Sequence, residues 1–173
     1  MIRKATEHDI PAVAAIYDAI LTKEEASPIT VVGWLRGVYP TEQTARTSLQ
    51  LDELYVMEVA DRVVAAAKIN KEQVPEYADC HWQYDAPDDQ VLVIHTLVVD
   101  PAVQGKGYAT QFIAYYEELA RSMNCPYLRM DTNAHNTPAR ALYKRLGYWE
   151  PGIVDCVFNG IPGVHLVCLE KKL

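Results

Sequence analysis

The chain has 173 residues, of which 50% are hydrophobic and 23% are charged, and its formal net charge is -7 at pH 7. This length and composition predict one globular domain over residues 1–173. The acidic balance argues against nucleic acid as a partner, because phosphate binding needs clustered Lys and Arg. The first residues lack the long apolar core of a signal peptide, and no apolar run reaches the length of a membrane span. We therefore expect a cytoplasmic protein with no membrane partner.

The cysteines and histidines predict no metal site. Cys80, Cys125, Cys156 and Cys168 form no C-x-x-C pair, and no histidine stands at a zinc-binding spacing from them. In a cytoplasm such cysteines stay reduced. We expect four free thiols and no bound metal.

The first ninety residues predict three strands, two helices and two irregular loops. Thr6, with Asp9 three residues on, resembles a capping box in front of an apolar helical face over 10–21. Prolines and glycines interrupt the loops. The strands are expected at 2–5, 55–60 and 63–70, the second helix at 41–54, and the loops at 24–40 and 71–90, with the two later strands joined as a hairpin at Asp61-Arg62.

The stretch from Val91 to Met123 predicts a buried strand, a glycine turn and an amphipathic helix. Val91 to Val99 are apolar except for His95 and Thr96 and are rich in β-branched residues, as in a central strand. Asp100-Pro101 ends the strand. From Ala109 onward apolar residues recur at helical spacing.

The last fifty residues predict three strands and one helix. A strand is expected at 127–131, and a helix begins at Thr137-Pro138, where proline occupies its favoured first position, and ends at Gly147. Two closing strands, 148–159 and 165–170, flank a turn at 160–163.

The turn Gln104-Gly105-Lys106-Gly107-Tyr108-Ala109 has the chemistry of a phosphate site. Glycines leave backbone N–H groups uncovered, and the first turn of a helix adds unpaired donors and the positive end of its dipole. A Walker loop would need Ser or Thr after Gly105-Lys106, where Gly107 stands. The dinucleotide fingerprint would need a glycine in place of Thr110.

Two other motifs fit. Gln104, Gly107 and Ala109 meet the pattern Q/R-x-x-G-x-G/A after the strand LVVDP, and residues 136–148 (NTPARALYKRLGY) match N-x-x-A-x-x-L-Y-x-x-x-G-F/Y. Both resemble segments of the GNAT superfamily of acyl-CoA-dependent N-acyltransferases. The resemblance covers Val91 to Tyr148 well, and the rest of the chain by element order only.

This resemblance implies an α/β (α+β) fold with a mixed, mostly antiparallel sheet of about seven strands and about four helices on its faces. It also implies an N-acetyltransferase that moves an acetyl group from acetyl-CoA to a primary amine of a small molecule or peptide in a ternary complex. The residues that it implies for cofactor binding are Leu97, Val98 and Val99 through the main chain, the turn residues Gln104, Gly105, Lys106, Gly107, Tyr108, Ala109 and Thr110, and Asn136. Asn136 is equally a good helix cap.

Two side chains are candidates for catalysis. Tyr143 matches the family's general acid, which protonates the leaving thiolate. His95 stands two residues before Leu97, so strand alternation predicts that both side chains point to the same side, where His95 could take a proton from the amine. A hydrogen-bonded core histidine is the alternative. Other possible bases lie in the loop before the strand, at Glu72, Glu76, His81 and Asp85, while Trp82 and Tyr84 either line the acceptor pocket or pin that loop to the core.

Two further functions stay open from the sequence. One is a non-catalytic acyl-CoA-binding or sensor module, which the presence of Tyr143 disfavours. The other is a different nucleotide-binding fold, which the failed Walker and dinucleotide patterns disfavour. A homodimer is possible, since dimers are common in the family that the chain resembles.

Overall fold

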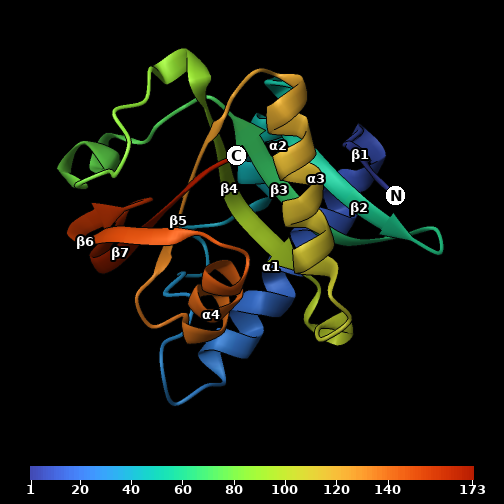
Figure 1. The fold of residues 1–173 in the computed structure, drawn as a ribbon. Helices are drawn as coiled ribbons and strands as arrows, with labels where there is room; N and C mark the ends of the chain where they lie inside the picture. The colour runs from blue at the N-terminus through green and yellow to red at the C-terminus, as the bar shows by residue number, and fades with distance from the viewer.

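The computed structural model describes residues 1–173 as a single seven-stranded sheet with helices on both faces (Figure 1). The strand order is β1-β2-β3-β4-β5-β7-β6, and only β4 and β5 run parallel. The strands are β1 (Ile2–Lys4), β2 (Leu54–Val59), β3 (Arg62–Asn70), β4 (Val91–Val99), β5 (Tyr127–Asn133), β6 (Trp149–Phe158) and β7 (Ile161–Lys172). The helices are α1 (Ile10–Glu25), α2 (Glu42–Gln50), α3 (Tyr108–Ser122) and α4 (Thr137–Arg145).

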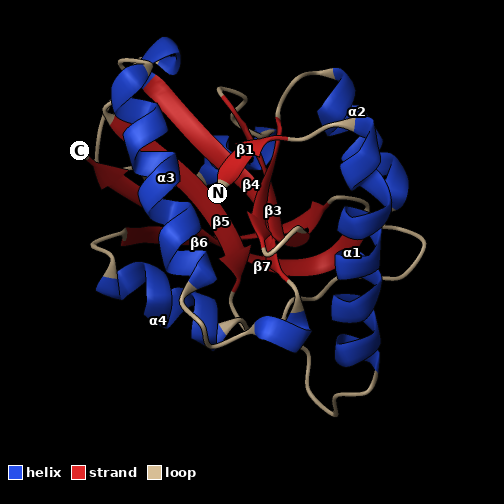
Figure 2. Ribbon diagram, turned by 90° about the vertical axis from the view of Figure 1, so that its right-hand side faces the viewer, coloured by secondary structure: helices blue, strands red, loops and turns tan.

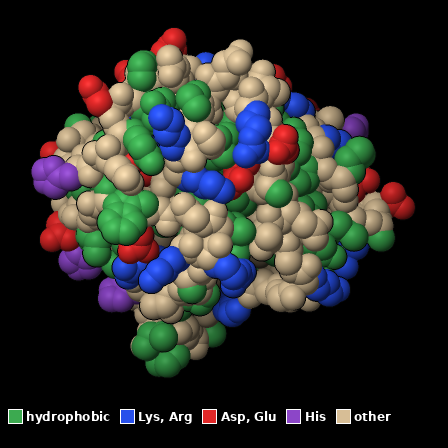
Figure 3. Space-filling view, in the orientation of Figure 1, with side chains coloured by type: hydrophobic (Ala, Val, Ile, Leu, Met, Phe, Trp, Pro, Cys, Tyr) green, Lys and Arg blue, Asp and Glu red, His purple; other side chains and the backbone are tan.

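The helices form a layer on each side of the sheet, with α3 and α4 on one face and α1 and α2 on the other (Figure 2). Phe112, Ile113 and Tyr116 of α3 are fully buried in the core of the first face. Ile10 and Val13 of α1 are fully buried in the core of the second. Lys and Arg side chains lie among acidic and apolar ones on the surface turned to the viewer (Figure 3). None of the helices combines the length and the apolarity that crossing a membrane requires.

The predicted order of elements is confirmed, and several boundaries move for local reasons. The last strand begins at Ile161 rather than 165, because the turn before it consists of Asn159 and Gly160, which both have positive φ. The second helix ends at Gln50 rather than 54, because Asp52 takes a left-handed φ of 58° and turns the chain into β2. The β2–β3 turn lies at Ala60-Asp61, one residue earlier than expected, since both residues have positive φ. Such a two-residue turn matches the twist of the strands that it joins.

The parallel strands β4 and β5 separate soon after they pair. Their register covers only Val91 to Val93 opposite Tyr127 to Arg129, although β4 continues to Val99 and β5 to Asn133. The sheet is therefore open between the C-terminal halves of these two strands, and this opening places the site.

The loop at 71–90 is held against the core by aromatic and ionic contacts. Trp82 packs on Tyr77, with ring centroids 5.1 Å apart, and lies 4.1 Å from the guanidinium of Arg129. Arg129 forms a buried ion pair with Glu170 at 3.1 Å and donates to the carbonyl of Tyr84. Of the two alternatives for Trp82 and Tyr84, the structure supports the one in which they pin the loop.

Candidate active site

A cleft of about 1090 Å³ begins at the opening between β4 and β5 and reaches both faces of the sheet. It is lined by the end of α1, the α1–α2 loop, β4, the glycine turn, β5, α4 and the β6–β7 hairpin. Every residue predicted for cofactor binding or catalysis lines it except Lys106, whose side chain is exposed and lies outside. The fold therefore brings the predicted site residues, which range from His95 to Tyr143 in the sequence, to one cleft.

The glycine turn presents a set of unpaired backbone donors to the cleft. Gly105 and Gly107 have φ of 83° and 78°, and Gly107 is the N-cap of α3. No backbone acceptor pairs with the N–H groups from Gly105 to Thr110. These donors lie at the N-terminus of a 15-residue helix, where anions are stabilised. The arrangement fits the pyrophosphate of an acyl-CoA.

Helix α4 brings Asn136 and Tyr143 into the cleft. The side chain of Asn136 accepts a hydrogen bond from the N–H of Ala139 at 3.3 Å, so this residue is the cap of α4 and also lines the cleft. Tyr143 is buried, with its ring 6.1 Å from that of Tyr148. Burial and the nearby charge of Asp131 raise the pKa of the Tyr143 phenol well above its usual value. Tyr143 is therefore protonated at neutral pH.

The prediction that His95 and Leu97 share a side is wrong, because a β-bulge interrupts β4. The register passes from Ala66 opposite Val98 to Lys68 opposite His95, so Ala67 faces two residues of β4. Thr96 occupies the bulge with φ of 52°. Its hydroxyl forms a hydrogen bond with the hydroxyl of Tyr39.

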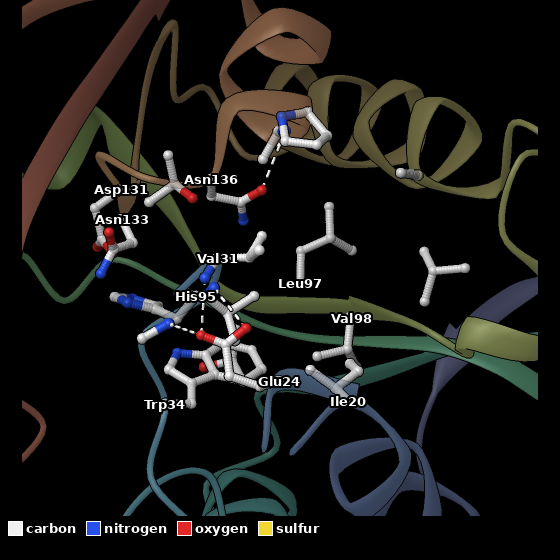
Figure 4. Close-up of a pocket in the computed structure, with 18 of the residues that line it drawn as sticks. Ile20, Glu24, Val31, Trp34, His95, Leu97, Val98, Asp131, Asn133 and Asn136 are labelled. Carbon is white, nitrogen blue, oxygen red and sulfur yellow. Dashed lines mark hydrogen bonds between the residues drawn. The ribbon is translucent and has the colours of Figure 1, made fainter. Parts of the chain in front are cut away.

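The extra residue reverses the alternation. Leu97 packs toward α3, whereas Val98 belongs to the core under α1 (Figure 4). His95 is on the same face as Val98, because both lie opposite β3 residues of that face.

His95 lies in a polar group at the edge of the cleft. Its Nε2 is 2.9 Å from the Oδ1 of Asn70, and Lys68 beside it forms ion pairs with Glu53 and Glu72. Burial, followed by the charge of Lys68, lowers the pKa of His95 to about 4. The imidazole is neutral at pH 7 and is a weak proton acceptor.

Asp131 is a candidate that sequence reasoning missed. It is half-buried where it lines the cleft, its Oδ2 accepts a hydrogen bond from Tyr77 at 2.7 Å, and no Lys or Arg forms an ion pair with it. Burial raises its pKa to about 6, against the effect of the Tyr77 hydrogen bond. Its position at the end of a strand that precedes the 136–148 motif was the available signal, but an aspartate there is equally typical of a turn.

Two residues at the end of α1 also shape the cleft. Glu24 accepts hydrogen bonds from the N–H groups of Val31, Val32 and Gly33 at 2.9, 3.2 and 2.9 Å and so folds the α1–α2 loop back on the helix (Figure 4). Lys23 donates to the Oε1 of Gln104 at 3.0 Å. An ammonium group from α1 therefore lies at the glycine turn, a position that the motif alone did not indicate.

The alternative bases of the 71–90 loop are separated by the fold. Glu72 lines the cleft, where its carboxylate accepts a hydrogen bond from Lys68 at 3.1 Å that lowers its pKa. Glu76, His81 and Asp85 do not line the cleft.

Solved structures share this fold over nearly their whole length. An acetyltransferase of the GNAT family from Streptococcus agalactiae aligns with a TM-score of 0.81 at 19% identity, covering 100% of this chain and 95% of that one. A ribosomal-protein-alanine N-acetyltransferase from Brucella melitensis aligns at 0.71 and 21%, covering 100% and 99%. A putative acetyltransferase from Salmonella typhimurium, solved with acetyl-CoA, aligns at 0.69 and 18%, covering 100% and 93%. The expected GNAT-like fold is confirmed, and the alternative of another nucleotide-binding fold is wrong.

Sequence comparison gives the family. Residues 19–148 match the model of the acetyltransferase (GNAT) family, and the chain belongs to that family. An uncharacterized N-acetyltransferase of Bacillus subtilis, YycN, is 31% identical over 87 residues, which are 50% of this chain and 55% of that protein. Another from Methanocaldococcus jannaschii, MJ1207, is 32% identical over 76 residues, which are 44% and 34%. The aligned region thus spans about half or less of each of these two relatives.

Proposed function

We propose that this chain is an N-acetyltransferase that transfers the acetyl group of acetyl-CoA to a primary amine by direct attack in a ternary complex. One observation carries the proposal: a cradle of unpaired backbone donors, a protonated buried tyrosine and a half-buried carboxylate with no ion-pair partner all face one cleft. The bound cofactor would supply an acetyl group activated as a thioester. Family membership and the fold support the reaction class.

The residues present fit this cosubstrate. The N–H groups from Gly105 to Thr110 would hold the pyrophosphate, with Lys23 beside them. Leu97, Val98 and Val99 line the opening between β4 and β5, where their main chain has no partner on β5. Backbone donors in such an opening stabilise negative charge on the reacting carbonyl oxygen. Asn136 would contact the pantetheine arm from the start of α4.

Asp131 is the proposed proton acceptor. An alkylammonium has a pKa near ~10 and must lose a proton before it can attack. A carboxylate with a pKa of about 6 is ionised at neutral pH and can both bind the ammonium and accept its proton. His95 is the second candidate, because it lines the same cleft and is neutral.

The proton balance of the transfer is complete with these groups. The ammonium gives one proton to Asp131, the N–C bond forms and the C–S bond breaks. The thiolate takes the proton of Tyr143, and the acylated nitrogen loses a second proton that restores the phenol. One proton is released to solvent when Asp131 ionises again.

Replacing Tyr143 by Phe tests the mechanism. We expect kcat to fall by roughly a hundredfold with little change in acetyl-CoA affinity, because a general acid acts in the chemical step and not in binding. Release of free thiol gives the rate, and calorimetric titration gives the affinity. An unchanged kcat would remove Tyr143 from the proposed mechanism.

The alternative is a non-catalytic acyl-CoA-binding module. The same two measurements distinguish it from an enzyme, because acetyl-CoA would bind in the titration and no amine would cause release of thiol. A homodimer stays a prediction, which sedimentation would test.

A further inference from the structure

One end of the cleft lies on the α1–α2 loop face of the sheet, away from the glycine turn. Strand register puts Asp131 opposite Cys168 and Asn133 opposite Leu166, so these side chains share one face. Beyond them the cleft wall is mostly apolar, with Asn159 as a polar residue between Phe158 and Ile161. Its apolar part is formed by Tyr39, Phe158, Ile161, Val164 and Leu166, which belong to one hydrophobic cluster.

Asp131 is the single acidic group set in this apolar wall. Its Oδ2 is occupied by the hydroxyl of Tyr77, and no ion pair reaches its other oxygen. The lysines of the cleft are already engaged, Lys23 with Gln104 and Lys68 with Glu53 and Glu72. An ionised carboxylate in apolar surroundings requires a cation or a proton.

Two contacts of the α1–α2 loop enclose this end. A Cβ placed on Gly33 would clash with the side-chain amide of Asn133, which would have to move aside. A Cβ placed on Gly160, at the tip of the β6–β7 hairpin, would stand 3.5 Å from Val38. The loop therefore touches both β5 and the hairpin, and the space for an acceptor is bounded on both sides.

We propose that the acceptor is a compact primary amine on an uncharged apolar body, with its ammonium on Asp131 and its body against Phe158, Ile161, Val164 and Leu166. This inference rests on the proposed function. A second ammonium, as in a polyamine, would be buried in the apolar wall. The carboxylate of a free amino acid would face this apolar wall, since Arg145, the remaining cation that lines the cleft, lies on α4 at the other face of the sheet. A polypeptide would have to displace the loop.

A series of linear amines from butylamine to hexylamine tests the apolar wall. With saturating acetyl-CoA, we expect kcat/KM to rise about fourfold with each added methylene, since each one leaves water on binding. 1,6-Diaminohexane is the matched control and should be worse than hexylamine by roughly thirtyfold, because its second charge is buried without a partner.

The outcomes separate the inference from the proposed function. Turnover that is highest with spermidine, or with a peptide that begins with alanine, would overturn the inference and leave the acetyltransferase. Acetyl-CoA binding with no turnover of any amine would overturn both.

Three variants test whether the apolar wall contacts the acceptor. Phe158→Asp should lower kcat/KM for hexylamine at least tenfold and raise the relative rate with 1,6-diaminohexane. Val157→Asp adds the same charge at the neighbouring position, which is exposed, and should change neither. The milder Val164→Thr should reduce hexylamine turnover about threefold, and the acetyl-CoA affinity of each variant reports its folding. An unchanged preference in both Phe158→Asp and Val164→Thr contradicts the proposal.

Discussion

Asp131 and His95 can be told apart as proton acceptors because burial moves their pKa values to different places. The pKa of Asp131 is raised to about 6 and that of His95 is lowered to about 4. The base must be unprotonated to act, so kcat/KM falls as the pH drops below its pKa in the free enzyme. Because the amine binds as an ammonium, its own protonation does not hide this fall of kcat/KM at low pH.

We therefore expect the acidic limb of kcat/KM to have its midpoint near pH 6. The measurement is the pH dependence of kcat/KM with hexylamine in wild type and in Asp131→Asn and His95→Gln. Asp131→Asn should abolish the limb and His95→Gln should keep it. A midpoint near pH 4 that His95→Gln removes would assign the base to His95 instead.

The glycine turn before α3 depends on a backbone conformation as well as on open space. Gly107 has φ of 78°, and nothing lies within 4 Å of a Cβ placed on it. Gly107→Ala should weaken acetyl-CoA binding roughly tenfold, because a methyl group and a strained backbone both displace the phosphate donors.

Gly37→Ala is the matched control for this turn. Gly37 has φ of 76° and the same open space, but it does not line the cleft. Both variants should lose similar stability, since a residue with a Cβ costs about 1–2 kcal/mol in this conformation. Calorimetric titration and thermal unfolding measure the two effects, and equal losses of acetyl-CoA affinity would argue against the cradle.

The loop at 71–90 depends on the buried pair Arg129–Glu170, whose side chains are 6% and 0% exposed. Arg129→Met should lower the free energy of unfolding by about 3–5 kcal/mol, because it leaves Glu170 buried without its partner. Arg121→Met breaks an exposed pair with Glu118 and should cost less than about 1 kcal/mol. Urea denaturation compares them, and similar losses would mean that the pair does not anchor the loop.

The molecule as a whole is divided at the cleft, since only three residue pairs join β4 to β5. A ligand that contacts β4, α3 and α4 connects the two halves of the sheet. At a concentration about a hundredfold above Kd, acetyl-CoA should add roughly 2.7 kcal/mol of stability, which is a rise in Tm of about 5–10 °C. Thermal unfolding with ATP and NAD as controls checks this, and equal shifts with all three would contradict a cradle specific for acyl-CoA.

The helices, the strands and the glycine turn could be predicted from the residues alone, because all of them depend on local chemistry. Helical and strand periodicity, proline and glycine placement and the spacing of Gln104, Gly107 and Ala109 all act within a few residues. The same holds for the cap formed by Asn136. These features predicted the order of the strands and helices and the uncovered donors of the glycine turn, whereas the other residues expected at the cofactor came from the resemblance to the GNAT superfamily.

The surroundings of His95 and Asp131 could not be predicted, because they depend on contacts between distant parts of the chain. The bulge at Thr96 depends on pairing with β3, and it moved His95 away from the side of Leu97. Asp131 gains its raised pKa from burial among residues far away in the chain, and the α1–α2 loop meets the β6–β7 hairpin only after folding. Register, burial and loop contact are long-range properties, which no local pattern of residues carries.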